Sequence, residues 1–215
     1  MTAEDYQAFW LWAGVKPQPV LRQAQEMYLL AGEVRERRGG GHVHVIAQRS
    51  ATPQLKGPTI WIVFRAQTIA WNDAVLDAVI AKAQVWRRAG NNVVGLQIDF
   101  DAGTRHLENY AAFLTQVRAR LPADYRLGVT GLLDWSANGD PAGLTALAGV
   151  VDELVLQIYQ GRRVIPGYET YLRRLDTLHI PFRIGLLQGG EWTAPAGLAS
   201  NPDFKGYVVF LVNPL

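Results

Sequence analysis

The sequence contains no cysteine, which excludes disulfide bonds, thiolate metal sites and cysteine nucleophiles. It also lacks an apolar run of the ~20 residues that a membrane-spanning helix needs, so we expect no membrane span. The first residues, MTAEDYQAFW, have neither the basic nor the apolar segment of a secretory signal. A removed leader would leave the same sequence, so the localisation stays unknown. The chain as given is expected to be soluble, and a periplasmic or secreted location would require that a signal segment has been removed.

The sequence also lacks a large excess of either positive or negative charge. The 21 Lys and Arg are dispersed among 19 Asp and Glu, which gives a net charge of +2 without the basic stripe that nucleic acid requires. The sequence also lacks the Gly-x-Ser-x-Gly elbow of a serine nucleophile, and no glycine-rich phosphate loop follows a predicted strand. We therefore expect no nucleic-acid partner and no cofactor. The oligomeric state is unknown from the sequence.

What the sequence does contain is an alternation of two patterns. With 215 residues, of which 49% are hydrophobic, the chain can bury one substantial core, and we expect a single domain over 1–215. Apolar, β-branched segments predict strands at 9–12, 26–34, 59–67, 92–100, 126–133, 153–159, 182–188 and 206–212. Apolar residues at three- and four-residue spacing predict helices at 71–89, 105–121, 140–151 and 166–179. We expect Asn72 or Asp73 to cap the first helix and Gly90 to end it.

Strands that alternate with helices are typical of parallel strands joined by right-handed crossovers. Eight strands favour closure into a (β/α)8 TIM barrel, an α/β fold, over an open doubly wound sheet. We expect a lean barrel with short or missing helices after its first, second, seventh and eighth strands, because such barrels typically have ~250 residues. The stretch 35–58 contains three consecutive glycines and two prolines and is typical of a loop, although HVHVIAQ within it has the pattern of an additional strand.

The segment GLQIDFD places polar side chains on one face of a predicted strand. Because successive side chains of a strand point to opposite faces, Gln97, Asp99 and Asp101 share a face and are expected to point into the barrel. Asp101 then lies nearest the carboxyl end, where the active sites of such barrels lie. A buried carboxylate is costly unless it is paired or hydrogen-bonded. The pattern therefore favours a functional role over the alternative, a structural network in which Asp99 bonds Thr130 or Arg65.

Polar and aromatic residues of other predicted strands are expected at the same end of the barrel. Tryptophans fall at or just after three strand ends, and together they would form a carbohydrate-stacking surface. A binding site is indicated by the gathering of many such residues at one end of the barrel, and not by any single one of them. The tryptophans are Trp12, Trp135 and Trp192, and the polar candidates for ligand contacts are Gln97, Gln157, Tyr159, Glu33, Arg65 and Gln188, with Asp101 and Asp99 as the catalytic candidates.

The strand that carries Asp101 resembles the fourth strand of the chitinase-like glycoside hydrolases of family 18. That strand ends in Gly-x-Asp-x-Asp-Trp-Glu preceded by Asp, and Gly95 to Asp101 is similar in the Gly, the middle Asp and the aromatic residue. The resemblance implies that Asp101 is the general acid and that Asp99 orients the acetamido group of the substrate, whose oxygen is the nucleophile. Gln97 and Val94 stand where that family has further Asp residues, and Asp101 is one methylene shorter than the family's Glu.

Two further positions are similar to that family. Its sixth-strand Met-x-Tyr-Asp resembles the segment from Gln157 to Gln160, in which Tyr159 is implied to bond the acetamido group. Phe210 stands where that family places a Trp floor in the eighth strand. Nearly the whole chain also resembles a bacterial family known as a domain of unknown function, number 3142, in its LQ-x-D-x-D and LQ-x-Y strands. This second resemblance implies a glycosidase-like barrel.

The residues leave three functions open. The first is a glycoside hydrolase for a poly- or oligosaccharide, in which Asp101 protonates the leaving oxygen. Its partner is Asp99 or the substrate itself in a retaining route, or Glu33 or Asp134 in an inverting route, where ~6.5–9.5 Å separates the two carboxyl groups. The second is a carbohydrate-binding barrel without catalysis. Metal-assisted hydrolysis through Asp99 and Asp101 is least favoured, because the four histidines lack a ligand spacing that reaches this pair.

Overall fold

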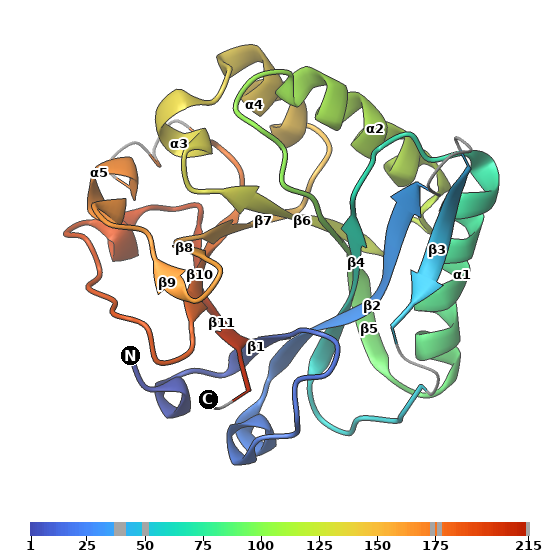
Figure 1. The fold of residues 1–215 in the computed structure, drawn as a ribbon, viewed down its shortest axis with the longest axis horizontal. Helices are drawn as coiled ribbons and strands as arrows, with labels where there is room; N and C mark the ends of the chain where they lie inside the picture. The colour runs from blue at the N-terminus through green and yellow to red at the C-terminus, as the bar shows by residue number, and fades with distance from the viewer. Residues whose placement is uncertain (37–41, 49–51, 173–174, 176–177, 214–215) are drawn as a thin grey trace.

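Eight parallel strands form a closed barrel in the computed structural model, which describes residues 1–36, 42–48, 52–172, 175 and 178–213. The strands follow one another around the barrel in chain order, and β1 pairs with both β2 and β11 to close the ring. They are β1 (Ala8–Leu11), β2 (Glu26–Glu36), β4 (Thr59–Ala66), β5 (Asn92–Asp99), β6 (Arg126–Leu132), β7 (Glu153–Gln157), β10 (Phe182–Leu187) and β11 (Phe204–Leu211). The predicted TIM barrel is confirmed (Figure 1).

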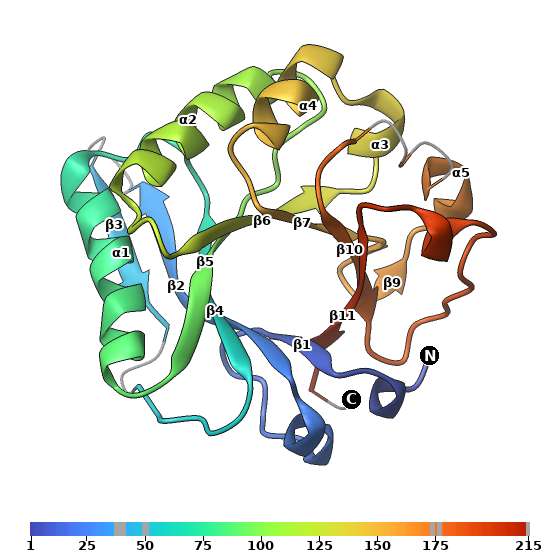
Figure 2. The same cartoon turned by 180° about the vertical axis from the view of Figure 1, so that it is seen from behind.

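Helices cover only part of the barrel wall. They are α1 (Asp73–Arg88), α2 (Leu107–Arg120), α3 (Trp135–Asn138), α4 (Pro141–Ala148) and α5 (Tyr168–Leu172). Loops and the 3-10 turns η1 (Ala3–Asp5), η2 (Pro19–Gln23) and η4 (Leu198–Ser200) lie beside the arc of β10, β11 and β1 (Figures 1 and 2). The barrel is therefore lean, as predicted. Among the described residues, no helix has both the length and the apolar character to cross a membrane.

The helix boundaries follow local signals in part. The side chain of Asn72 accepts a hydrogen bond from the backbone N–H of Val75 at 3.0 Å and so caps α1, as expected. Gly90, with a φ of 88°, follows the end of that helix. The helix predicted over 166–179 is wrong in its extent, because α5 ends at Leu172, while residues 173, 174, 176 and 177 lie outside the described residues. The short α3 is an addition, since one turn is too short to show periodicity.

The described residues contain two antiparallel strand pairs in addition to the barrel, one of β2 with β3 and one of β8 with β9. HVHVIAQ does form a strand, β3 (Val43–Ala47), which pairs antiparallel with β2, while the three glycines before it lie outside the described residues. The strand predicted over 153–159 ends at Gln157, because Tyr159 belongs to a small hairpin. This hairpin consists of β8 (Tyr159–Gln160) and β9 (Arg163–Val164).

Apolar side chains pack on both sides of the barrel wall. Leu96 and Ile98 of β5 belong to the outer core beneath the helices. Their neighbour Gln97 accepts a hydrogen bond from the inward Trp10 ring at 2.8 Å, so the alternation of β5 is as predicted. The inner core fills the barrel with buried side chains that include Trp10, Tyr28, Leu30, Trp61, Val63, Val155 and Phe210.

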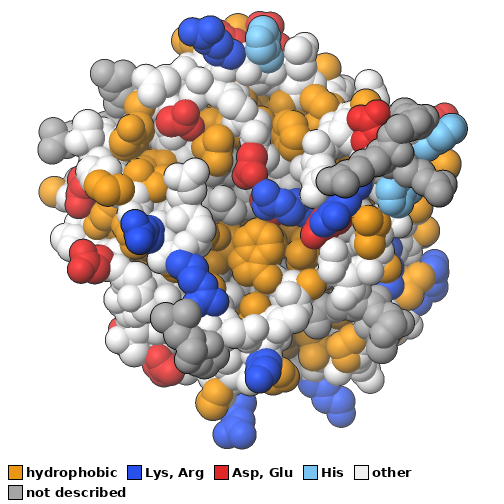
Figure 3. Space-filling model, viewed as in Figure 1, with side chains coloured by type: hydrophobic (Ala, Val, Ile, Leu, Met, Phe, Trp, Pro, Cys, Tyr) orange, Lys and Arg blue, Asp and Glu red, His pale blue; other side chains and the backbone are white. Residues whose placement is uncertain are grey.

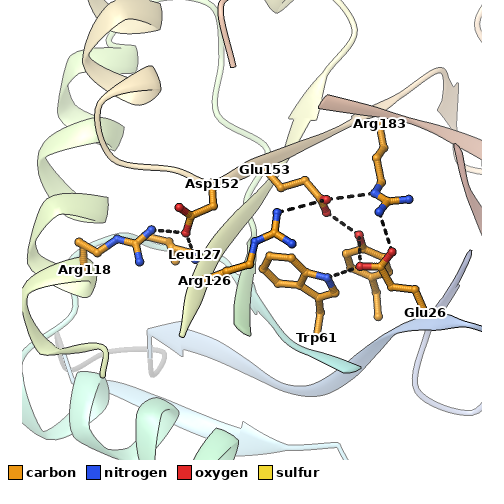
Figure 4. Close-up of polar contacts among 9 residues, drawn as sticks. Glu26, Trp61, Arg118, Arg126, Leu127, Asp152, Glu153 and Arg183 are labelled. Carbon is orange, nitrogen blue, oxygen red and sulfur yellow. Dashed lines mark hydrogen bonds and ion pairs between the residues drawn. The ribbon is translucent and has the colours of Figure 1, made fainter. Parts of the chain in front are cut away.

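A network of buried charges closes the amino-terminal end of the barrel (Figure 4). Arg183 bonds Glu153 at 3.0 Å and Glu26 at 2.7 Å, and Glu153 is 1% exposed. The hydroxyl of Tyr28 donates to Glu153, and the indole N–H of Trp61 donates to Glu26 at 2.7 Å. The charges at this end of the barrel are therefore paired with one another, which is typical of the stabilising end of such barrels.

Candidate functional site

A cavity of about 770 Å³ opens at the carboxyl ends of the barrel strands. Figure 3 looks onto this face, where hydrophobic side chains lie in a central hollow with acidic and basic side chains beside them. The side chains that line it come from many strand ends and include Trp12, Arg65, Asp101, Asp134, Gln157 and Tyr159. TIM-barrel enzymes bind their substrates at this end of the barrel. We call it the mouth cavity.

Asp101 and Asp99 are both held by one arginine. Arg65, at the end of β4, donates to Asp99 Oδ2 at 2.9 Å and to Asp101 Oδ2 at 2.8 Å. The side chain of Asp101 is 54% exposed and lines the mouth cavity, whereas that of Asp99 is fully buried below it. Thr130 donates to the other oxygen of Asp99 at 2.7 Å. The two carboxylates therefore differ in access: a ligand in the cavity can touch Asp101, while Asp99 anchors Arg65.

Burial raises the pKa of Asp99 above its ordinary value, and the nearby charge of Asp101 acts in the same direction. The charge of Arg65 and the hydrogen bond from Thr130 oppose this rise. The structural alternative considered from the sequence, with Asp99 bonded to Thr130 and Arg65, therefore describes Asp99 well. Asp101 has no such enclosure, since only Arg65 pairs with it among the described residues.

Tyr159 presents an unsatisfied hydroxyl at the mouth. The residue is 8% exposed, lines the cavity and packs its ring against Phe210 at 5.1 Å between centroids. Within the described part of the chain, its hydroxyl has no hydrogen-bond partner. Burial, followed by the charge of Asp99, raises its pKa well above the ordinary value of a tyrosine. Tyr159 therefore keeps a neutral hydroxyl at neutral pH, and this hydroxyl is buried beside the cavity.

Trp12 forms an aromatic wall of the cavity. Its ring lies 4.5 Å from that of Trp10, and the guanidinium of Arg65 lies 5.7 Å from its centroid. The expected surface of three tryptophans does not form. Trp135 is fully buried and donates to the carbonyl oxygen of Ala102 at 2.8 Å. The third, at position 192, packs against the rings of tyrosines 168 and 207 in the outer core, so one ring of the three lines the mouth.

Four other residues predicted to contact a ligand do not line the mouth cavity. Gln97 and Phe210 are fully buried inside the barrel, where Gln97 bonds Trp10 and Phe210 stacks on it at 5.0 Å. Glu33 pairs with Arg35 on the part of β2 that pairs with β3. Gln188 donates to Gln18 at 2.7 Å and accepts from the backbone at position 212. Gln97 and Phe210 therefore pack inside the barrel, while Glu33 and Gln188 form hydrogen bonds or ion pairs outside the cavity lining.

Sequence patterns missed part of the cavity wall. Gln160 and Arg162 come from the β8–β9 hairpin, and Tyr171 comes from α5. A signal for the hairpin existed in Gly161, which has a φ of 60° between the two short strands. Asp134 also lines the cavity, and its Oδ1 is buried without a hydrogen-bond partner among the described residues. Asp134 and Asp101 are thus the carboxyl groups of the cavity lining.

Several solved structures are similar to this chain. The chitinase domain of the spore coat protein CotE from Clostridium difficile is similar with a TM-score of 0.51 and 11% identity, over 84% of this chain and 65% of that one. The Bacillus cereus spore cortex-lytic enzyme SleL is similar with a TM-score of 0.52 and 18% identity, over 76% of this chain and 44% of that one. The chain thus spans less than two thirds of either protein. At these identities the likeness shows the fold alone, a TIM barrel.

The family follows from the sequence itself. Residues 59–171 match the family described as "Domain of unknown function (DUF3142)", and the chain belongs to this family. The match runs from β4 to α5 and so includes Arg65, Asp99, Asp101, Asp134 and Tyr159. No curated protein matches the sequence.

Proposed function

We propose that the chain is a glycoside hydrolase that binds a poly- or oligosaccharide in the mouth cavity, with Asp101 as its principal catalytic carboxyl group. The observation that carries the proposal is the position of Asp101 at the carboxyl end of β5. Its side chain is 54% exposed in an open cavity that also contains Asp134 and the ring of Trp12. Two carboxyl groups beside an aromatic surface are what hydrolysis of a glycosidic bond requires.

The reaction divides between the two carboxyl groups. Asp101 gives a proton to the glycosidic oxygen as the bond between this oxygen and the anomeric carbon breaks. Asp134 takes a proton from the water that forms the new bond to the anomeric carbon. This arrangement inverts the anomeric configuration and needs ~6.5–9.5 Å between the carboxyl groups. Glu33 and Asp99 do not line the cavity, so neither is the partner of Asp101 in this proposal.

The remaining cavity residues suit a sugar. The ring of Trp12 offers a flat apolar face for the C–H bonds of a pyranose. Tyr159 lines the same cavity, with a buried hydroxyl that has no partner among the described residues. Gln157 adds an amide at the end of β7. Asp99 acts through Arg65: by fixing one end of the guanidinium, it holds the other end against Asp101.

A second candidate function is carbohydrate binding without hydrolysis. The ion pair between Arg65 and Asp101 favours this candidate, because the guanidinium already occupies one oxygen of Asp101 at 2.8 Å. In this case Asp101 accepts hydrogen bonds from sugar hydroxyls, and Arg65 keeps it in place.

The experiment compares hydrolysis and binding on the same glycans. Purified protein is tested on aryl glycosides and on a panel of oligosaccharides, with reducing ends and product anomers followed by NMR. For a hydrolase, Asp101→Asn and Asp134→Asn should each lower kcat by roughly 100- to 10,000-fold, the range for general acid–base groups. Glu33→Gln is the matched control, because it removes a carboxylate outside the cavity and should leave kcat unchanged.

The outcomes separate the two candidates. Glycan binding by the wild type without any product, weakened by Asp101→Asn, would identify the carbohydrate-binding barrel. Turnover that survives Asp101→Asn, with unfolding midpoints equal to the wild type, would overturn the assignment of Asp101. A protein that neither binds nor cleaves any glycan of the panel would contradict both candidates.

A further inference from the structure

We propose that the carbohydrate is acidic and that Arg162 binds the carboxylate of a uronic acid unit. This inference rests on the proposed carbohydrate site and names the class of its ligand. Arg162 lines the mouth cavity from the β8–β9 hairpin, whereas Asp101 follows β5.

A tight and anchored turn carries Arg162. Tyr159 pairs with Val164 and Gln160 pairs with Arg163, so Gly161 and Arg162 are the two residues of the turn between β8 and β9. The φ of 60° at Gly161 is in the left-handed region that such two-residue turns require. The base of the hairpin is joined to the barrel, because the backbone N–H of residue 158 donates to the carbonyl oxygen of Gly185 in β10 at 3.2 Å. The position of the Arg162 backbone is therefore defined by the fold.

The two arginines of the cavity differ in their partners. Arg65 is neutralised by Asp99 and Asp101. Arg162, in contrast, has no ion pair or hydrogen bond among the residues that the structure describes, although it lines the same cavity. A guanidinium presents a planar fork of donors that fits a carboxylate with two parallel hydrogen bonds. The cation of Arg162 is thus available to an anionic group of a ligand.

The carboxylate of Asp134, which also lines the cavity, narrows the class of sugar that fits beside Arg162. Asp134 has no ion pair within the described residues either, so a ligand meets a free carboxylate and a free guanidinium in one cavity. A uronic acid satisfies both, because its carboxylate pairs with Arg162 and its hydroxyls donate to Asp134. A neutral sugar leaves Arg162 without an anion, and an amino sugar brings a second cation to it.

The test uses sugars that differ only in the carboxylate. Affinities are measured by calorimetry for oligosaccharides of glucuronic, galacturonic and mannuronic acid and for their carboxyl-reduced forms, in which the carboxylate becomes a hydroxymethyl group. The wild type should bind one acidic oligosaccharide at least about tenfold more tightly than its reduced form, as one hydrogen-bonded charge pair provides. This preference should decrease as the salt concentration rises.

Two variants of the hairpin assign the preference to one side chain. Arg162→Gln should abolish the tenfold difference between the acidic and the reduced oligosaccharide while it keeps binding of the reduced form. Arg163→Gln is the matched control, because both arginines are exposed but only Arg162 lines the cavity, and this variant should keep the preference. A loss of preference in both variants alike would overturn the role of Arg162, since general attraction by the hairpin would then explain it.

The remaining results separate this inference from the proposed function. If neutral oligosaccharides bind or are cleaved as well as the acidic ones, the carbohydrate site stands and the acidic ligand is wrong. If Arg162→Gln retains the preference for the acidic form, Arg162 is not the carboxylate partner. If no sugar of either form binds or is cleaved, the proposed carbohydrate site fails, and the inference fails with it.

Discussion

Tyr28→Phe is expected to destabilise the barrel, because the hydroxyl of Tyr28 donates to the buried carboxylate of Glu153. The remaining partners of Glu153 are Arg183 at 3.0 Å and Arg126 at 3.8 Å. A hydrogen bond to a charged group contributes about 1.5–3 kcal/mol to the free energy of unfolding. For a chain of this size, 1 kcal/mol corresponds to about 2–4 °C in Tm, so the variant should lose about 3–12 °C.

Tyr110→Phe is the matched control for this loss. Tyr110 is also buried, but its hydroxyl has no hydrogen-bond partner among the described residues, so its removal should be neutral or stabilising. The free energy of unfolding of the wild type and both variants is measured by urea denaturation. An equal loss in both variants, or no loss in Tyr28→Phe, would refute the reasoning, because the effect would not depend on the bond to Glu153.

The cost of Tyr28→Phe should also depend on pH. Burial raises the pKa of Glu153 above its ordinary value, while the charge of Arg183 and the hydrogen bond from Tyr28 lower it. Around the raised pKa the folded state holds a proton that the unfolded chain has released, so the free energy of unfolding falls as the pH rises through it. Below that pKa Glu153 is neutral and needs the donor less. The difference between variant and wild type should therefore be smaller at about pH 4 than at neutral pH.

Three further changes test packing, capping and the support of the site. Gly95→Ala should cost about 1–3 kcal/mol, because a Cβ there would lie 2.4 Å from the backbone carbonyl oxygen of Arg126 and 2.7 Å from the ring of Trp61. Gly103→Ala, with nothing within 4 Å, should cost nothing measurable by urea denaturation. Asn72→Ala should cost about 1 kcal/mol in the same assay through loss of the α1 cap. Thr130→Val removes a bond to Asp99 that lowers the pKa of this residue, so it should cost about 1.5–3 kcal/mol at neutral pH and less in acid, where Asp99 is protonated.

The strands were predictable because their signal is local. Each barrel strand contains a mainly apolar segment, and the period of two in GLQIDFD was enough to assign Gln97 and Asp99 to the inside. Helices of three or more turns carry a similar signal, which is why α1 and α2 were found nearly to their ends. The short α3 and the β8–β9 hairpin lack this repetition, since each consists of a single turn or of two paired residues.

The sequence could predict a cavity residue only when its side chain points inward and also lies high enough along the barrel axis to reach the open space. Periodicity tells which face a side chain takes, but it does not tell how far along the barrel axis the open space begins. Gln97 and Asp101 share a face, yet Gln97 is fully buried in the inner core and Asp101 lines the cavity. Trp135 was expected at the mouth because it follows a strand end, but α3 turns it into the outer core. Its burial depends on tertiary packing, which the local sequence does not contain.

The partner of Asp101 depends on a backbone irregularity that no sequence pattern marked. In the pairing of β4 with β5, Ile60 lies beside Val93 but Trp61 lies beside Gly95, so β5 contains one extra residue. Without this bulge Arg65 would lie beside Ile98, and the faces of the following residues of β5 would be inverted, so that Ile98 would point inward and Asp99 toward the helices. With it, Arg65 lies beside Asp99, both point inward, and the guanidinium also reaches Asp101. A ligand that uses Asp101 must therefore bind beside Arg65 or displace it, so the same bulge determines whether Asp101 can act as an acid or only as a binding group.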